Sequence, residues 1–65
     1  MYQLYIEKSN SFSKDLVGEY EDLEDAQVKA KQKKAEDSSI RYIIEETDGS
    51  FNSYGDLITY VVEKG

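Results

Sequence analysis

The 65-residue chain has no cysteine, no histidine, no proline and no tryptophan. Without cysteine and histidine it can form no disulfide, no thiolate nucleophile and no zinc site of the usual ligand types. A Ser-His-Asp set is also impossible, and the commonest general base is missing. The Asp-x-Asp-x-Asp-Gly spacing of a calcium loop does not occur either. These absences predict a protein that is not an enzyme and that holds no metal ion and no other cofactor.

Glycine and arginine are scarce. The four glycines stand singly at positions 18, 49, 55 and 65, which excludes a glycine-rich phosphate-binding loop. Arg41 is the only arginine, and 14 acidic against 8 basic residues give a net charge of −6, so the field of the molecule repels polyanions. We therefore expect no direct nucleic-acid binding. A small-molecule substrate is not expected either, because a chain this short offers little room for a cleft.

Long apolar runs are missing as well. No run approaches the roughly 20 residues that span a bilayer, and the start MYQLYIEK lacks the pattern of a secretory signal. We expect a single small domain over residues 1–65, located in the cytoplasm and not in a membrane. A chain of this size buries only about 60% of its unfolded surface, so its stability is marginal without added support. With disulfides and zinc excluded, self-association is the support that remains.

What the sequence does contain is mostly strand-like alternation. Polar and apolar residues alternate over 2–8 and 40–47, and shorter segments at 15–20 and 57–63 are also typical of strands. Gly18 inside the second segment suggests a bulge or a close approach. Asp48-Gly49 is a strong hairpin signal, from which we expect 51–54 to return antiparallel to 40–47.

Residues 21–37 are the only helical stretch. Asp22 is placed to cap the first turn, Glu24 and Asp25 lie near the start, and the lysines gather near the end, as the helix dipole favours. A spacing of 100° per residue puts one face toward a sheet, and that face is thin and made of small residues. Its members are Leu23, Ala26, Gln27, Ala30 and Lys34, while Val28 and Ala35 lie off it. We expect large side chains from the sheet, Tyr20, Tyr42 and Ile44, to fill the layer beneath it.

The order of these segments predicts an α+β fold, a single antiparallel sheet of four to five strands with one helix packed on one face (ββαββ or ββαβββ). One helix covers only one face of the sheet, so the other face is the candidate interaction face. The alternating residues expected there are Tyr5, Ile43, Leu57 and Val61. We expect a homodimer, or a complex with another protein, to form through this face. The alternatives are a loop over residues 9–14, with Phe12, that folds over this face, or charged neighbours that dilute it.

Two further readings concern the acidic residues and the tyrosines. A candidate acidic patch comprises Glu19, Glu21, Asp22, Glu24, Asp25, Glu45, Glu46 and Asp48. Such a surface keeps a small protein soluble, and it could also imitate nucleic-acid phosphates in an inhibitor of a DNA- or RNA-binding enzyme. Six tyrosines are compatible with a base-stacking platform, but the mainly acidic surroundings favour ordinary strand tyrosines. The sequence thus predicts a small interaction or self-assembly module, with an acidic inhibitor as the alternative.

Overall fold

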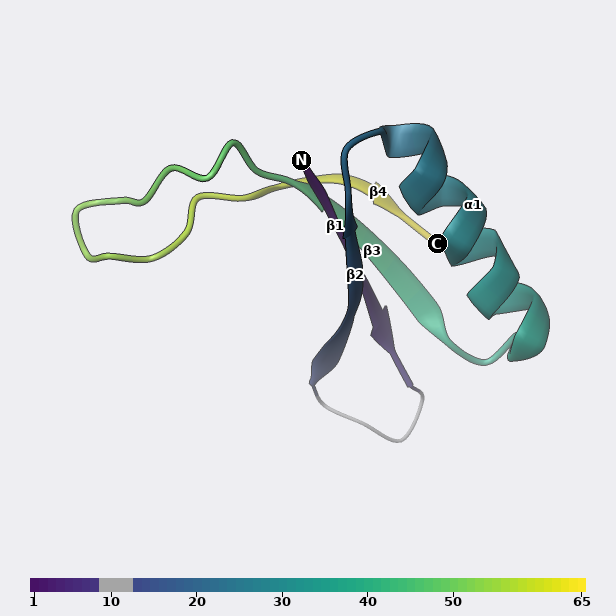
Figure 1. Ribbon diagram of the computed structural model, residues 1–65. Helices are drawn as coiled ribbons and strands as arrows, with labels where there is room; N and C mark the ends of the chain where they lie inside the picture. Colours follow the sequence, from purple (N-terminus) through teal and green to yellow (C-terminus); the bar gives the residue numbers. More distant parts are fainter. Residues whose placement is uncertain (9–12) are drawn as a thin grey trace.

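The computed structural model describes residues 1–8 and 13–65, which form one sheet with one helix packed against it (Figure 1). The elements are β1 (Tyr2–Glu7), β2 (Lys14–Tyr20), α1 (Leu23–Glu36), β3 (Arg41–Glu46) and β4 (Tyr60–Lys64). The strand order is β2-β1-β3-β4, and every neighbouring pair is antiparallel. The predicted α+β class with one antiparallel sheet and one helix is therefore confirmed, in its ββαββ form.

The two central strands set the register. Leu4 lies opposite Ile44 and Tyr5 lies opposite Ile43 in the antiparallel pair of β1 and β3. Because residues directly opposite each other share a face, Leu4 and Ile44 point together toward α1. The predicted alternation of these two strands is confirmed.

A bulge in β2 shifts the pairing with β1. Leu4 pairs with Gly18 and Tyr5 with Leu16, so Val17 is the extra residue between them. Val17 packs against the core under the helix. A Cβ atom at Gly18 would lie 3.1 Å from the hydroxyl oxygen of Tyr20, so the absence of a side chain at Gly18 leaves room for the Tyr20 ring. The bulge expected near Gly18 is present, and the extra residue is Val17, the residue before Gly18.

Helix α1 presents the predicted face to the sheet. Ala26 and Ala30 are fully buried, and Leu23 packs beside them. Val28, expected off this face, is 56% exposed. The expected side-chain cap is wrong: Asp22 is the N-cap residue by its extended backbone, but its carboxylate accepts no cap hydrogen bond among the described residues.

The core is a small cluster between helix and sheet. Leu4 and Ile44 are its largest fully buried side chains, and they lie against the two helix alanines. Tyr20 and Tyr42 pack around it, as expected of large side chains beneath a helix of small ones. The remaining partly buried members are Tyr2, Val17 and Leu23. Because the alanines contribute little apolar area, most of the burial comes from the strands.

The region after β3 differs from the prediction. Residues 51–54 do not return along β3, and β4 begins at Tyr60 rather than at Leu57. Instead the chain runs outward, turns over 52–55 and comes back, so that residues 48–59 form an arm that projects away from the sheet and α1 (Figure 1). Gly49 does have a positive φ of +85°, but the amide of Gly49 bonds the Thr47 hydroxyl and that of Ser50 bonds Asp48. These local bonds bend the chain without closing a hairpin.

Candidate interaction surface

The side of the sheet turned away from α1, here called the distal face, is built by the central strands and extended by the edge strands. The register places Tyr5 and Ile43 side by side near its middle. Leu16 of β2 lies opposite Tyr5, and Val61 of β4 lies opposite Glu45. A bulge in β4, between the partners of Ile44 and Glu45, sets which β4 side chains reach this face.

Three of the four predicted interaction residues lie on the distal face of the sheet. Tyr5 and Ile43 are half-buried neighbours, and Val61 is 52% exposed. Leu57 lies outside β4, on the arm, where it lines a shallow hollow of about 290 Å³ with distal-face residues such as Gln3 and Glu19. The predicted set thus occupies one side of the molecule, partly on the sheet and partly on the arm.

Leu16 was missed by the sequence reasoning, although it is 53% exposed on the distal face. The bulge at Val17 explains the omission, because an extra residue reverses the alternation within β2. Gly18 was the one signal that could have found it. Of the loop predicted to fold over the face, residues 9–14, positions 9–12 with Phe12 lie outside the described residues, and Lys14 is the first residue of β2.

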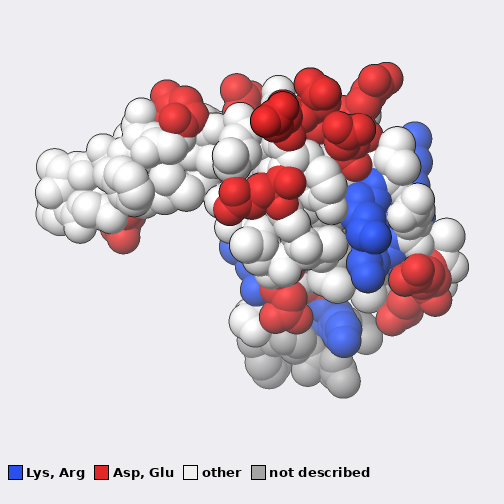
Figure 2. Space-filling model, in the orientation of Figure 1, with Lys and Arg blue, Asp and Glu red and all other residues white. Residues whose placement is uncertain are grey.

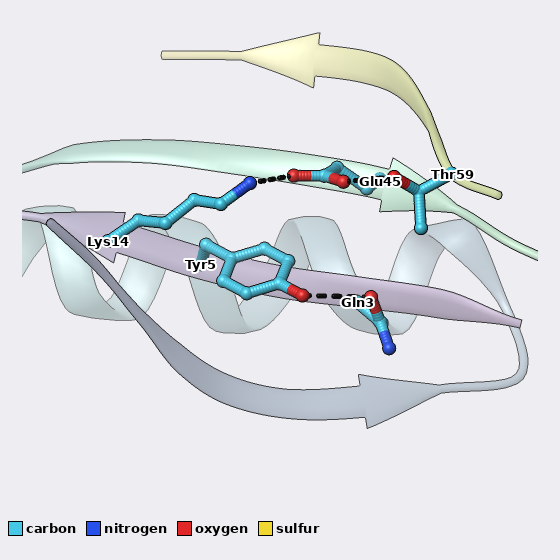
Figure 3. A network of polar contacts seen from close by, with 5 residues as sticks. All are labelled: Gln3, Tyr5, Lys14, Glu45 and Thr59. Carbon is cyan, nitrogen blue, oxygen red and sulfur yellow. Dashed lines mark hydrogen bonds and ion pairs between the residues drawn. The ribbon is translucent and has the colours of Figure 1, made fainter. Parts of the chain in front are cut away.

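A polar network occupies the centre of the distal face (Figure 3). The Lys14 ammonium donates to one carboxylate oxygen of Glu45, and the Thr59 hydroxyl donates to the other at 2.6 Å. The same ammonium lies 4.4 Å from the centre of the Tyr5 ring, a cation–π geometry. The Tyr5 hydroxyl in turn donates to the Gln3 side-chain oxygen at 2.9 Å. The network connects residues from β1, β2, β3 and the arm.

Glu45 is buried, which is unusual for a residue with a charged carboxylate. Burial by itself raises its pKa, but hydrogen bonds from Lys14 and Thr59 and the positive charge of Lys14 outweigh it, so the pKa lies below its ordinary value. The pKa of Lys14 is raised, first by its hydrogen bond to Glu45. Both groups are therefore charged at neutral pH and hold each other in place.

This burial corrects the predicted acidic patch, because Glu45 is not on the acidic surface. The other members are exposed, and most of them gather where α1 begins (Figure 2). They are Glu19, Glu21, Asp22, Glu24, Asp25, Glu46 and Asp48. In the described part of the chain, no three acidic residues are grouped so as to hold a metal ion.

Charges of opposite sign mark the two ends of the distal face. At one end, here called the basic end, Arg41 and Lys64 line a hollow of about 280 Å³, which Glu7 also lines. At the other, the acidic end, Glu19 and Asp48 line the hollow that also contains Leu57. The Asp48 carboxylate accepts bonds from Ser50, which keep its pKa below the ordinary value. The face is therefore electrically polarised along its strands.

The arm and β4 carry exposed aromatic residues that sequence reasoning did not select. Phe51 is 65% exposed, Tyr54 89% and Tyr60 68%. The available signal was charge, since residues 49–62 contain a single charged residue, Asp56, in a chain that is 34% charged. Figure 2 shows this arm as a mostly uncharged projection from a charged body.

The described residues contain no helix that is both long enough and apolar enough to cross a membrane. Comparisons with protein-family models, with curated proteins and with solved structures find no match for the chain.

Proposed function

We propose that the protein is a non-enzymatic self-assembly module, which forms a homodimer by packing the distal face of its sheet against the same face of a second copy. The observation that carries this proposal is the exposure of Leu16 and Val61, each above one half, on either side of the Tyr5–Ile43 pair. These four large side chains come one from each strand, and a sheet-on-sheet interface is built from such side chains on its inner face.

The polar centre of the face is compatible with burial in such an interface. Glu45, Gln3 and Thr59 already have hydrogen-bond partners in the same chain. Among the described residues, no buried side-chain nitrogen or oxygen lacks a partner. The polar atoms that are already buried therefore add no unsatisfied donor or acceptor to such an interface, which would be the main penalty of burying polar groups.

The test is molar mass in solution, by light scattering on a size-exclusion column, over a hundredfold range of concentration and at low and high salt. The unaltered chain should dimerise, and Ile43→Asp or Val61→Asp should weaken the dimer by at least about tenfold, because each introduces a charge into an apolar contact. Val28→Asp is the matched control, since Val28 is 56% exposed on the outer side of α1, close to the 52% of Val61.

Salt separates this proposal from the acidic-inhibitor alternative. Apolar contacts persist in salt, so a distal-face dimer should survive with at most a modest loss. A chain that stays monomeric at every concentration would contradict the dimer. If that monomer captured a basic nucleic-acid-binding protein and released it on addition of salt, the exposed carboxylates at the start of α1 would become the functional surface.

A further inference from the structure

The arm continues the distal face beyond the sheet. Phe51 and Leu57 form an antiparallel bridge, so their side chains share one side of the arm. Leu57 lines the hollow that Gln3 and Glu19 of the distal face also line. Phe51 is therefore on the same side of the molecule as the proposed interface, and it is 65% exposed.

The arm is held in this position by its own hydrogen bonds. The amide of Ile58 donates to the Ser50 carbonyl at 2.9 Å, and the amide of Asn52 donates to the Asp56 carbonyl at 2.8 Å. At its base the Thr47 hydroxyl donates to the Ile58 carbonyl at 2.9 Å. An element ordered before it meets a partner loses little conformational freedom on binding, which favours affinity.

The polarity of the distal face selects one dimer orientation. Two identical faces meet isologously through a two-fold axis lying in the interface. If the axis runs along the strands, Arg41 and Lys64 of both copies come together, and like charges meet. If it runs across the strands, the basic end of each copy covers the acidic end of the other, with Glu19 and Asp48 opposite the cations. The second arrangement is the complementary one.

That orientation brings the arm of each copy to the basic end of its partner. The arm leaves the sheet at the acidic end, where Asp48 and Leu57 line the hollow. Phe51 pairs with Leu57, so it lies beside that hollow. In the second arrangement the arm therefore extends over the partner's basic end, where Arg41 and Lys64 border the other hollow.

The area of the sheet indicates that such an additional contact is needed. Four strands at about 4.8 Å spacing and about 20 Å length present a face of roughly 400 Å². Stable specific interfaces bury about 800 Å² per partner. The arm supplies apolar surface on the correct side, with Phe51 as its large residue.

We infer that the dimer is isologous, with the strands of the two copies antiparallel across the interface, and that Phe51 of each copy docks in the Arg41–Lys64 hollow of the other, with its ring against the Arg41 guanidinium. This inference depends on the proposed dimer through the distal face. The Phe51 ring carries no charge, so the Glu7 carboxylate that also lines the hollow does not repel it. A guanidinium stacked on an aromatic ring is attracted to it. The two-fold axis makes two such contacts per dimer.

A double-mutant cycle on the dimer dissociation constant tests the inference. Phe51→Ser and Arg41→Ser should each weaken the dimer about tenfold, because each removes two ring–guanidinium contacts. The double variant should be little weaker than the worse single variant. Tyr54→Ser is the matched control, since it removes an even more exposed ring, 89% against 65%, from the tip of the same arm and should leave dissociation nearly unchanged.

Because the chain contains no cysteine, a mixture of Phe51→Cys and Arg41→Cys variants gives an independent readout. Under oxidation the mixture should form a disulfide-linked heterodimer, and a Tyr54→Cys variant mixed with Arg41→Cys should form far less. Additive effects in the cycle, or no preferential cross-link, would overturn the arm contact. If Val61→Asp still abolished the dimer in that case, the distal-face proposal would stand, whereas a monomeric parent chain would overturn both.

Discussion

The Lys14–Glu45 pair offers the sharpest test of the structure, through the variant Lys14→Met. Methionine keeps an unbranched stem of similar length and removes the ammonium group. The Glu45 carboxylate then remains buried, with the Thr59 hydroxyl still donating but without its counter-charge. Removing one partner of a fully buried ion pair costs about 3–5 kcal/mol.

That magnitude must be reduced here because the Lys14 side chain is 43% exposed and solvent screens it. A loss of about 1–2 kcal/mol in the free energy of unfolding remains. For a domain this small such a loss lowers Tm by roughly 5–15 °C. Denaturant and thermal unfolding measure it at a fixed protein concentration, since dimerisation would otherwise shift the result. Lys31→Met, the same change at an exposed position on α1, should stay within about 0.5 kcal/mol of the parent chain.

The pH dependence of this effect carries a defined sign. In the parent chain the pKa of Glu45 is below its ordinary value, so its contribution to stability is present above that value and is lost as the pH falls through the lowered pKa. In Lys14→Met burial becomes the dominant influence, and the pKa of Glu45 should rise above the ordinary value. The variant should then become more stable as the pH falls toward that pKa, while the parent does not.

NMR titration of the Glu45 carboxyl in parent and variant, combined with unfolding at neutral and acid pH, tests both the rise in pKa and the change in stability. A rise of one pKa unit in the variant corresponds to about 1.4 kcal/mol. The reasoning is refuted if the pKa of Glu45 stays below its ordinary value in Lys14→Met. It is also refuted if the stability difference between parent and variant is the same at neutral pH and below the folded pKa.

Three further predictions follow from other parts of the fold. Ala30→Leu should destabilise the protein by about 1–3 kcal/mol in denaturant unfolding, because the fully buried Ala30 lets α1 sit close to the sheet; a neutral result would mean the layer has spare room. Glu63→Gln should lower the pKa of Tyr42, which burial and then the hydrogen bond to Glu63 at 3.0 Å raise; NMR of the ring should show the change, and an unchanged value would argue against the contact. Asn52→Ala should accelerate hydrogen exchange at the Tyr54 amide, which donates to the Asn52 side chain at 2.9 Å, while the β1 amides keep their protection.

Local pattern was enough to predict α1, its buried face and the two central strands. The period of α1 placed Ala26 and Ala30 inside and Val28 outside, because a helix fixes the direction of each side chain over a few residues. The alternation of β1 and β3 likewise placed Tyr5 and Ile43 together on the distal face. These results depend only on neighbours in sequence.

The arm was not predictable in the same way. The Asp48-Gly49 pair was interpreted as a hairpin turn, yet the reversal of the chain occurs at 52–55, where the Asn52 carbonyl accepts from the Gly55 amide and Gly55 has a φ of +84°. Residues that favour turns occur at both sites. The antiparallel pairing of Phe51 with Leu57 places the reversal at 52–55. Such a choice depends on which backbone partners are satisfied, not on turn propensity alone.

The sequence by itself determined the absence of cysteine and histidine chemistry, the acidic charge, the single helix with its small-residue face and the strand alternation, since these follow from composition and short-range period. Only the tertiary structure decided that Glu45 is buried, because its partner Lys14 lies 31 residues away in the chain. The bulge at Val17, which turns Leu16 onto the distal face, and the direction of the arm were decided there too. Pairing between distant strands fixes all three, and a one-residue shift in that pairing reverses which side chains face outward.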